Sequence, residues 1–247
     1  MNIKHSFLRP LAHAVYNRGP VGGLLSYMTV VREFISYRRR TNETVRIADF
    51  FPWPIDRYCE AGDAGMYFYQ DAWCAGHVKA SAVRRHVDVG SSMMFVSTVL
   101  QMCELLYVDL RPITINLPQF HYQRGDLTNL PFETGSIESL SSLSVVEHVG
   151  LGRYGDKLDP LGTDKTCLEL ARVLAPGGTL YVAVPTASSN STCFNAHRIF
   201  APDDFMAKFP GLRILEERYA LQSGTICRCE YDHLNLPFAF GCFAFTK

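Results

Sequence analysis

The sequence has no feature that assigns it to a metal-binding, membrane-spanning or nucleic-acid-binding class. Its 8 cysteines include no Cys-x-x-Cys pair, and the tightest spacing is Cys227-x-Cys229, so we expect no metal site. No apolar run reaches the length of a transmembrane helix, so we expect no membrane-spanning segment. The 24 Lys and Arg residues balance the 24 Asp and Glu residues, whereas a dedicated nucleic-acid binder needs a basic excess.

The first residues also lack the unbroken apolar stretch of a secretory signal peptide, because Arg9, His13 and Arg18 interrupt it. We therefore expect a cytoplasmic protein whose thiols stay reduced, with cysteines in buried strands. The G-x-G-x-x-G run of dinucleotide-binding enzymes is absent as well, which disfavours an NAD-type oxidoreductase.

Residues 1–40 are basic although the whole chain is neutral. The segment has one acid, Glu33, against the basic residues Lys4, Arg9, Arg18, Arg32, Arg38, Arg39 and Arg40. Apolar side chains recur at helical spacing and predict a helix over residues 21–40. The segment is either a solvated basic extension or an arm that meets an anionic surface, such as a membrane face or a partner. We assign a basic helical extension to residues 1–45 and the main domain to residues 46–247, with residues 41–66 as linker and lid.

From Arg85 onward, strand and helix patterns alternate. Strands are predicted at 86–89, 105–108, 120–124, 137–145, 179–184, 212–219 and 238–245, and helices at 67–83, 91–103, 163–174 and 201–208. This alternation is typical of an α/β fold with a mostly parallel sheet covered on both faces. Ligands of such sheets bind outside the carboxyl ends of the strands, so the residues that follow each strand are the candidates for a site.

The residues at the ends of four of the predicted strands suit a nucleoside site. The positions are Asp88, Gly90, Ser91 and Ser92 at the end of the first strand, Asp109 and Leu110 at the end of the second, Asp126 and Leu127 after the third, and Val145, Glu147 and His148 at the end of the fourth. Gly90 permits a sharp turn close to a ligand, and the Ser91 and Ser92 amides open a helix whose free N–H groups attract anions. Asp109 can accept from a ribose diol, Asp126 from an adenine amino group, and Leu127 can cover the ring. The alternative is that these acids only cap helices or form turns.

The stretch from Arg85 to Pro185 resembles the class I S-adenosylmethionine-dependent methyltransferases. The resemblance rests on Asp88-x-Gly90, on Asp109, on the run 125–132 (GDLTNLPF), on 145–149 (VVEHV) and on 169–178 (ELARVLAPGG). It implies a three-layer Rossmann-like sheet of seven strands, the last antiparallel and formed by residues 238–245, and S-adenosylmethionine as cofactor. The sequence departs from the family pattern where later glycines would stand, at Ser92 and Met94, and Met94 is expected to crowd the helix against the strand or reshape the pocket.

A narrower resemblance concerns residues 148–156 and 194–200, which are similar to an uncharacterised methyltransferase-like family often found near polysaccharide biosynthesis. It implies a small-molecule or glycan-like acceptor. Arg153, Tyr154 and Asp156 lie in a glycine-punctuated loop and are candidates for acceptor binding, as are His197 and Arg198. A plain surface turn is the alternative for the loop. Tyr69, Gln70 and Trp73 precede the first strand and either line the pocket or form an aromatic core face.

Methyl transfer to a hydroxyl requires a base near the methyl group, and His148 is the candidate because an imidazole is largely unprotonated near neutral pH. Glu147 could orient it, or His148 could instead pack against the methionine end of the cofactor. The predicted function is methyl transfer from S-adenosylmethionine, O-directed. The main alternative is a catalytically silent scaffold or binding protein that keeps the sheet. The oligomeric state stays open.

Overall fold

The computed structural model describes residues 8–50, 52–54, 65–234 and 238–247. The chain forms two compact units, residues 1–63 and residues 64–247, and each is described by itself. The predicted boundary after residue 45 falls inside the first unit. Part of the predicted linker and lid, residue 51 and residues 55–64, lies outside the described residues.

The first unit consists mainly of one broken helix. Helix α1 spans Leu8–Arg40 and is interrupted at Gly19, whose φ of 71° is left-handed, so it consists of two segments. The segment after Gly19 matches the helix predicted over residues 21–40, and the segment before Gly19 was not predicted. The two segments pack closely, because a Cβ on Gly23 would lie 2.5 Å from the backbone nitrogen of Val15. A 3-10 helix, η1, spans Ile47–Asp49.

The second unit is built on one eight-stranded sheet in the order β3-β2-β1-β4-β5-β10-β8-β9. The strands span Arg85–Val89 (β1), Glu104–Asp109 (β2), Phe120–Arg124 (β3), Ile137–Leu143 (β4), Leu174–Thr186 (β5), Arg213–Leu221 (β8), Gly224–Ile226 (β9) and Ala239–Thr246 (β10). Strands β1 to β5 pair in parallel, and β10 is antiparallel to both of its neighbours, β5 and β8. The predicted sheet with an antiparallel last strand is therefore confirmed, with the short β9 as an eighth member.

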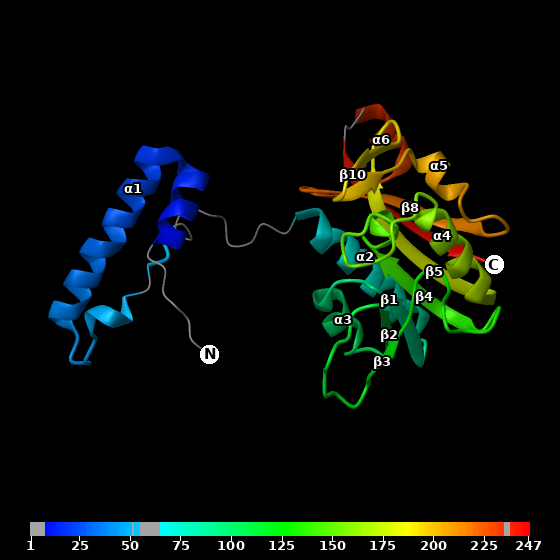
Figure 1. The fold of residues 1–247 in the computed structure, drawn as a ribbon, viewed down its shortest axis with the longest axis horizontal. Coiled ribbons are helices and arrows are strands. Elements are labelled where there is room, and N and C mark those ends of the chain that lie inside the picture. The colour runs from blue at the N-terminus through cyan, green and yellow to red at the C-terminus, as the bar shows by residue number, and fades with distance from the viewer. Residues whose placement is uncertain (1–7, 51, 55–64, 235–237) are drawn as a thin grey trace. The chain divides into compact units, whose positions relative to one another are not determined.

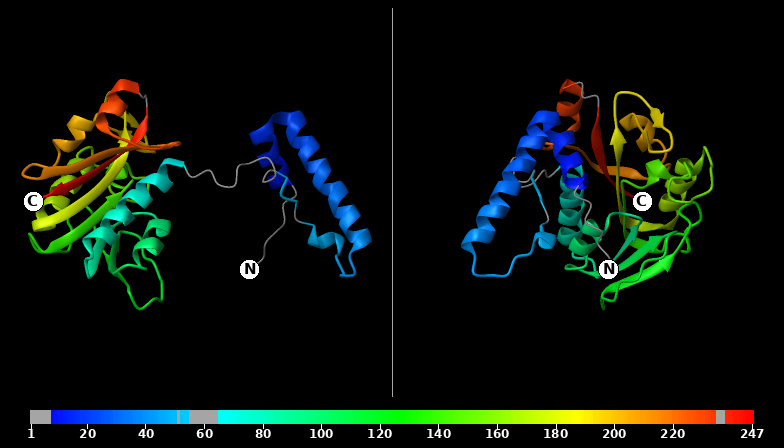
Figure 2. Two further views of the ribbon diagram at one scale, coloured as in Figure 1. Left: turned by 180° about the vertical axis from the view of Figure 1, so that it is seen from behind. Right: turned by 60° about the vertical axis from the view of Figure 1, so that its left-hand side comes forward.

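Helices cover both faces of this sheet, which makes three layers (Figures 1 and 2). Helices α2 (Gly65–Ser81) and α3 (Met93–Val99) cover one face, and α4 (Gly162–Val173) and α5 (Pro202–Met206) cover the other. Strand β10 alternates between the two cores, since Cys242 packs on the α2–α3 side and Phe243 and Phe245 pack on the α4–α5 side. The remaining elements are η3 (Val146–His148), α6 (Arg228–Leu234) and the hairpin of β6 (Ser191–Cys193) and β7 (His197–Ile199).

Several predicted boundaries are wrong for local reasons. Helix α3 begins at Met93 and not at residue 91, because Ser92 is its N-cap and accepts from the Phe95 amide at 3.1 Å. Strand β4 ends at Leu143 and not at residue 145, because Ser144 takes a left-handed φ of 55°. The expected crowding by Met94 does not occur, since 76% of this side chain is exposed.

Candidate functional site

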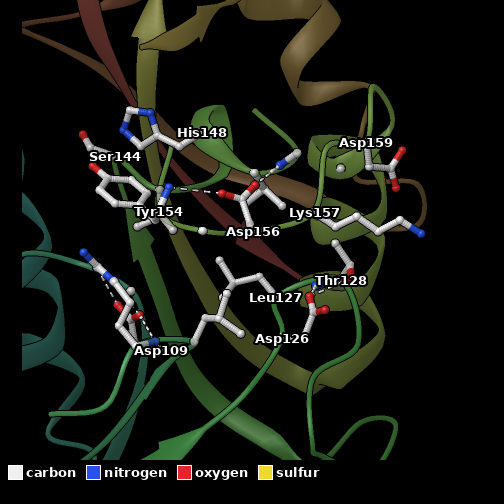
Figure 3. Close-up of a pocket in the computed structure, with 18 residues that line it drawn as sticks. Asp109, Asp126, Leu127, Thr128, Ser144, His148, Tyr154, Asp156, Lys157 and Asp159 are labelled. Atoms are coloured by element: carbon white, nitrogen blue, oxygen red, sulfur yellow. Dashed lines mark hydrogen bonds and ion pairs between the residues drawn. The ribbon is translucent and has the colours of Figure 1, made fainter. Parts of the chain in front are cut away.

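A cavity of about 350 Å³ opens at the carboxyl ends of β1, β2 and β4 and beside the turn that follows β3 (Figure 3). Its size suits a small molecule. Nine of the residues predicted from the sequence line it, namely Gly90, Asp109, Leu110, Asp126, Leu127, Val145, His148, Tyr154 and Asp156. The fold therefore brings together residues that lie far apart in the chain, at the place where an α/β sheet binds ligands.

Gly90 lines the cavity and needs to be glycine. Its φ is 78°, and a Cβ at this position would lie 2.9 Å from Cγ1 of Val145. Only glycine combines this left-handed conformation with so close an approach between the turn after β1 and the segment after β4.

Three other predicted binding residues, at the end of β1 and in the turn after it, hydrogen-bond within the protein. The buried Asp88 carboxylate accepts from the Ser91 amide at 3.0 Å and from the Ser91 hydroxyl at 2.6 Å. The Ser92 hydroxyl caps α3 and donates to Asp71 of α2. Asp88, Ser91 and Ser92 do not line the cavity and instead fix the shape of the turn beside it.

Asp109, predicted to accept from a ribose, is held by neighbouring donors. The Arg111 guanidinium donates from Nε to Oδ1 at 3.1 Å and from Nη2 to Oδ2 at 2.8 Å, and the Tyr107 hydroxyl donates to Oδ2 at 3.1 Å. Burial opposes ionisation of Asp109, but the bonds from Arg111 outweigh it and keep the pKa of the carboxyl below its usual value. A ligand hydroxyl that takes this carboxylate must replace the bonds from Arg111.

The turn after β3 presents one carboxylate oxygen to the cavity. Oδ1 of Asp126 accepts from the Thr128 amide at 2.8 Å and from the Thr128 hydroxyl at 2.7 Å. Oδ2 takes part in no hydrogen bond among the described residues. Leu127 follows with an apolar side chain, and Figure 3 shows it between Asp109 and Asp156.

His148 lines the cavity and is mostly buried, whereas Glu147 is fully buried and lies behind it. Nδ1 of His148 lies 2.6 Å from the carbonyl oxygen of Ala196, so Nδ1 carries the hydrogen and Nε2 keeps its lone pair. Burial lowers the pKa of His148 to about 4, so the ring is neutral at neutral pH. Oε1 of Glu147 lies 3.6 Å from Nε2, and burial raises the pKa of this carboxyl to about 8.

The loop from Gly150 to Gly162 forms the far wall of the cavity. Asp156 accepts from the amides of Gly150 and Gly152 and so closes the loop on itself. The start of the loop packs against its later part so closely that position 150 must be glycine, since a Cβ on Gly150 would lie 1.9 Å from the carbonyl oxygen of Asp159. The loop therefore has a conformation fixed by its own contacts and lines the cavity, which a plain surface turn would not do.

Tyr154 stands at the centre of an aromatic and cationic stack. The Arg111 guanidinium lies 4.6 Å from the Tyr154 ring centroid and that of Arg153 lies 5.1 Å from it, while the His148 ring meets Tyr154 edge-on at 5.5 Å. Figure 3 shows Tyr154 between His148 and Asp109. Arg153 does not line the cavity, but it donates to the Ala196 carbonyl oxygen at 2.8 Å, the same oxygen that holds His148.

The structure does not bring His197 and Arg198 to the cavity. The His197 ring lies 6.5 Å from the His148 ring. Arg198 donates to the Val149 carbonyl oxygen at 2.7 Å and to the Thr163 hydroxyl at 3.1 Å, so it anchors the start of the loop. Of the α2 residues, Gln70 accepts from the Ser144 hydroxyl and Trp73 packs on the core.

Sequence reasoning missed five polar residues that line the cavity: Arg111, Thr128, Ser144, Lys157 and Asp159. Each lies within three residues of a predicted site residue, so widening every motif by three residues would have included them. Among the described residues, no group of three or more His, Cys, Asp or Glu side chains could hold a metal ion.

Comparisons with known proteins agree with the fold. The family described as "Caenorhabditis protein of unknown function, DUF268" matches residues 131–225. This range contains both motifs of the narrower resemblance, but it assigns no function, so the link to polysaccharide biosynthesis stays a prediction. A search of the curated proteins finds no match to this sequence.

Two solved methyltransferases have a similar fold. Burkholderia thailandensis 1,6-didemethyltoxoflavin-N1-methyltransferase, with bound 1,6-didemethyltoxoflavin and S-adenosylhomocysteine, has a TM-score of 0.51 at 11% identity, over 90% of this chain and 89% of that chain. Geranyl diphosphate methyltransferase, in complex with GPP and sinefungin, has a TM-score of 0.50 at 12% identity, over 72% of this chain and 76% of that chain. The likeness shows that this chain has the Rossmann-like methyltransferase fold.

Two glycines of the loop should differ in how much stability is lost when each is replaced by alanine. Gly150 and Gly155 both have left-handed φ, but a Cβ on Gly155 would have no neighbour within 4 Å. We expect Gly155→Ala to lower the free energy of unfolding by about 1 to 2 kcal/mol, the strain alone. Gly150→Ala should cost about 3 kcal/mol or more, as a disrupted core contact does. Denaturant unfolding measures both, and equal losses would contradict the proposed close contact with Asp159.

The buried Glu147 predicts a pH-dependent stability. Because the pKa of Glu147 is raised to about 8 from its usual value of 4.5, the folded chain holds a proton that the unfolded chain releases between these two pH values. The free energy of unfolding therefore falls as the pH rises from 4.5 to about 8. Glu147→Gln keeps the shape without the ionisation. Its Tm relative to the unmodified protein should therefore rise between about pH 5 and about pH 9. The exposed Glu133→Gln serves as control for the loss of a surface carboxyl, and a Tm difference for Glu147→Gln that does not change with pH would refute the assignment.

Proposed function

We propose that the second unit binds S-adenosylmethionine and transfers its methyl group to a hydroxyl of a small-molecule or glycan-like acceptor. The observation that carries the proposal is that one cavity collects Gly90, Asp109, Asp126 and Val145 from four different strand ends. The two solved structures of similar fold are both methyltransferases, which supports this cofactor over a dinucleotide.

The residues present fit the cofactor. The unpartnered Oδ2 of Asp126 can accept from the adenine amino group, and the apolar side chains of Leu110 and Leu127 can cover the ring. Asp109 can accept from the ribose hydroxyls once the Arg111 side chain gives way. When bound at these residues, the cofactor would supply a methyl group on a sulfonium sulfur, activated for direct displacement by an acceptor oxygen.

A hydroxyl acceptor must also lose a proton, and we assign this proton to Nε2 of His148. Its lone pair is free at neutral pH because the ring is neutral and Nδ1 holds the hydrogen. Glu147, whose Oε1 lies 3.6 Å from Nε2, is mostly protonated at neutral pH because burial raises its pKa to about 8, so it stabilises the imidazolium only as the pH approaches that value. Tyr154, held by Arg111 and Arg153, lines the cavity and can contact the acceptor.

A second candidate function is a catalytically silent binding protein. The observation that favours it is the state of Asp109, whose two oxygens are both occupied by Arg111 and Tyr107. If these bonds persist, the ribose has no acceptor there and the cofactor is not held.

Calorimetry with S-adenosylmethionine and S-adenosylhomocysteine separates the two candidates. We expect both ligands to bind and Asp109→Ala to weaken binding by about 10-fold to about 100-fold, the effect of lost hydrogen bonds to a charged group. The exposed Glu133→Ala serves as control, and thermal unfolding checks that the fold is intact. No binding of either ligand would favour the silent protein, and binding of NAD alone would overturn the assignment of Asp126.

His148→Ala tests the chemistry separately from binding. The variant should bind S-adenosylhomocysteine normally, while methyl transfer to hydroxylated small molecules or glycans falls by about 100-fold, the lower end of general-base effects. His121→Ala, an exposed histidine on β3, is the matched control. If the transfer rate is unchanged in His148→Ala, this residue only packs beside the cofactor.

A further inference from the structure

Helix α1 bears an exposed apolar face that its own unit does not use. Val21, Leu24, Leu25, Met28 and Ile35 each expose between 45% and 73% of their surface. Their spacing places them on one side of the helix. The opposite side is occupied, since Gly23 lies against Val15 and the Phe34 ring lies 4.6 Å from the Phe50 ring.

The same face carries positive charge. Arg32 and Arg39 fall at the angular positions of Leu25 and Val21, and both are exposed. Arg38 belongs to the occupied side, since its guanidinium lies 5.8 Å from the Phe34 ring centroid and donates to the Val45 carbonyl oxygen at 2.8 Å. The single acid of the helix, Glu33, lies off the face, so no carboxylate on the face balances Arg32 and Arg39.

The charge decides which partner fits. The apolar positions 21, 24, 28, 31 and 35 would also suit pairing with a second copy of the helix, but that copy brings the same arginines and no acid on its paired face. An anionic lipid surface satisfies both features, because apolar side chains enter the acyl boundary while guanidinium groups reach the phosphates. No helix among the described residues is long and apolar enough to cross a membrane.

We propose that the face formed by Val21, Leu24, Leu25, Met28, Arg32, Ile35 and Arg39 lies on an anionic lipid bilayer, parallel to its surface. The proposal concerns the first unit alone and does not depend on the function proposed for the second. It would keep the protein at a membrane surface.

Vesicle co-sedimentation of the full chain tests this. We expect binding to phosphatidylcholine vesicles that contain phosphatidylserine, no binding to pure phosphatidylcholine, and weaker binding as salt screens the charges. The double variant Arg32→Gln and Arg39→Gln should weaken binding by about 25-fold, at about 5-fold for each arginine. Leu25→Glu should abolish it without changing the Tm, because Leu25 is exposed.

A matched pair provides the control. Arg84 and Arg85 are adjacent exposed arginines of the second unit, and Arg84→Gln with Arg85→Gln should leave vesicle binding unchanged. An equal loss in this control would overturn the proposal in favour of general charge attraction. Absence of binding to anionic vesicles at low salt would overturn it too, as would a dimer in light scattering that Leu25→Glu dissociates.

Discussion

The buried carboxylate of Asp88 is the interaction on which the candidate site depends. It accepts the amide and hydroxyl of Ser91 and the hydroxyl of Ser141, so it joins β1, β4 and the turn between β1 and α3. Burial raises the pKa of Asp88 to about 6, against the effect of these hydrogen bonds. A buried charge is tolerated only where its oxygens are satisfied, and these three donors satisfy them.

This carboxylate also fixes the direction of a longer chain of hydrogen bonds. Because the Ser141 hydroxyl donates to Asp88, it accepts from Nε2 of His86 at 2.8 Å, and Nδ1 of His86 then accepts from the Ser139 hydroxyl. Burial lowers the pKa of His86 to about 3, so the ring stays neutral and keeps this arrangement. The network explains why a central strand with buried serines is stable. Each polar group on that face of β4 has a partner on β1.

Regular patterns predicted most of the sheet, because buried strands and amphipathic helices leave periodic signals. The strand-end rule likewise predicted the cavity residues Gly90, Asp109, Asp126 and His148. The direction of a side chain at a strand end left no such signal. Asp88, near the end of β1, points inward because it accepts from Ser141, and no local pattern reports a contact with a residue 53 positions later. Short elements such as β6, β9 and α6 were missed for the same reason, since tertiary contacts and not periodicity hold them.

Arg111 links the two halves of the cavity. It holds Asp109 at the end of β2 and at the same time covers the ring of Tyr154 in the loop after η3. A ribose hydroxyl cannot donate to Asp109 while both Arg111 bonds persist, since each carboxylate oxygen already accepts a hydrogen bond. Occupation of Asp109 by a ligand therefore changes the surroundings of Tyr154, which in turn packs on His148. The residues assigned to cofactor and to acceptor are thus physically coupled through one guanidinium group, and a substitution at Arg111 acts on both.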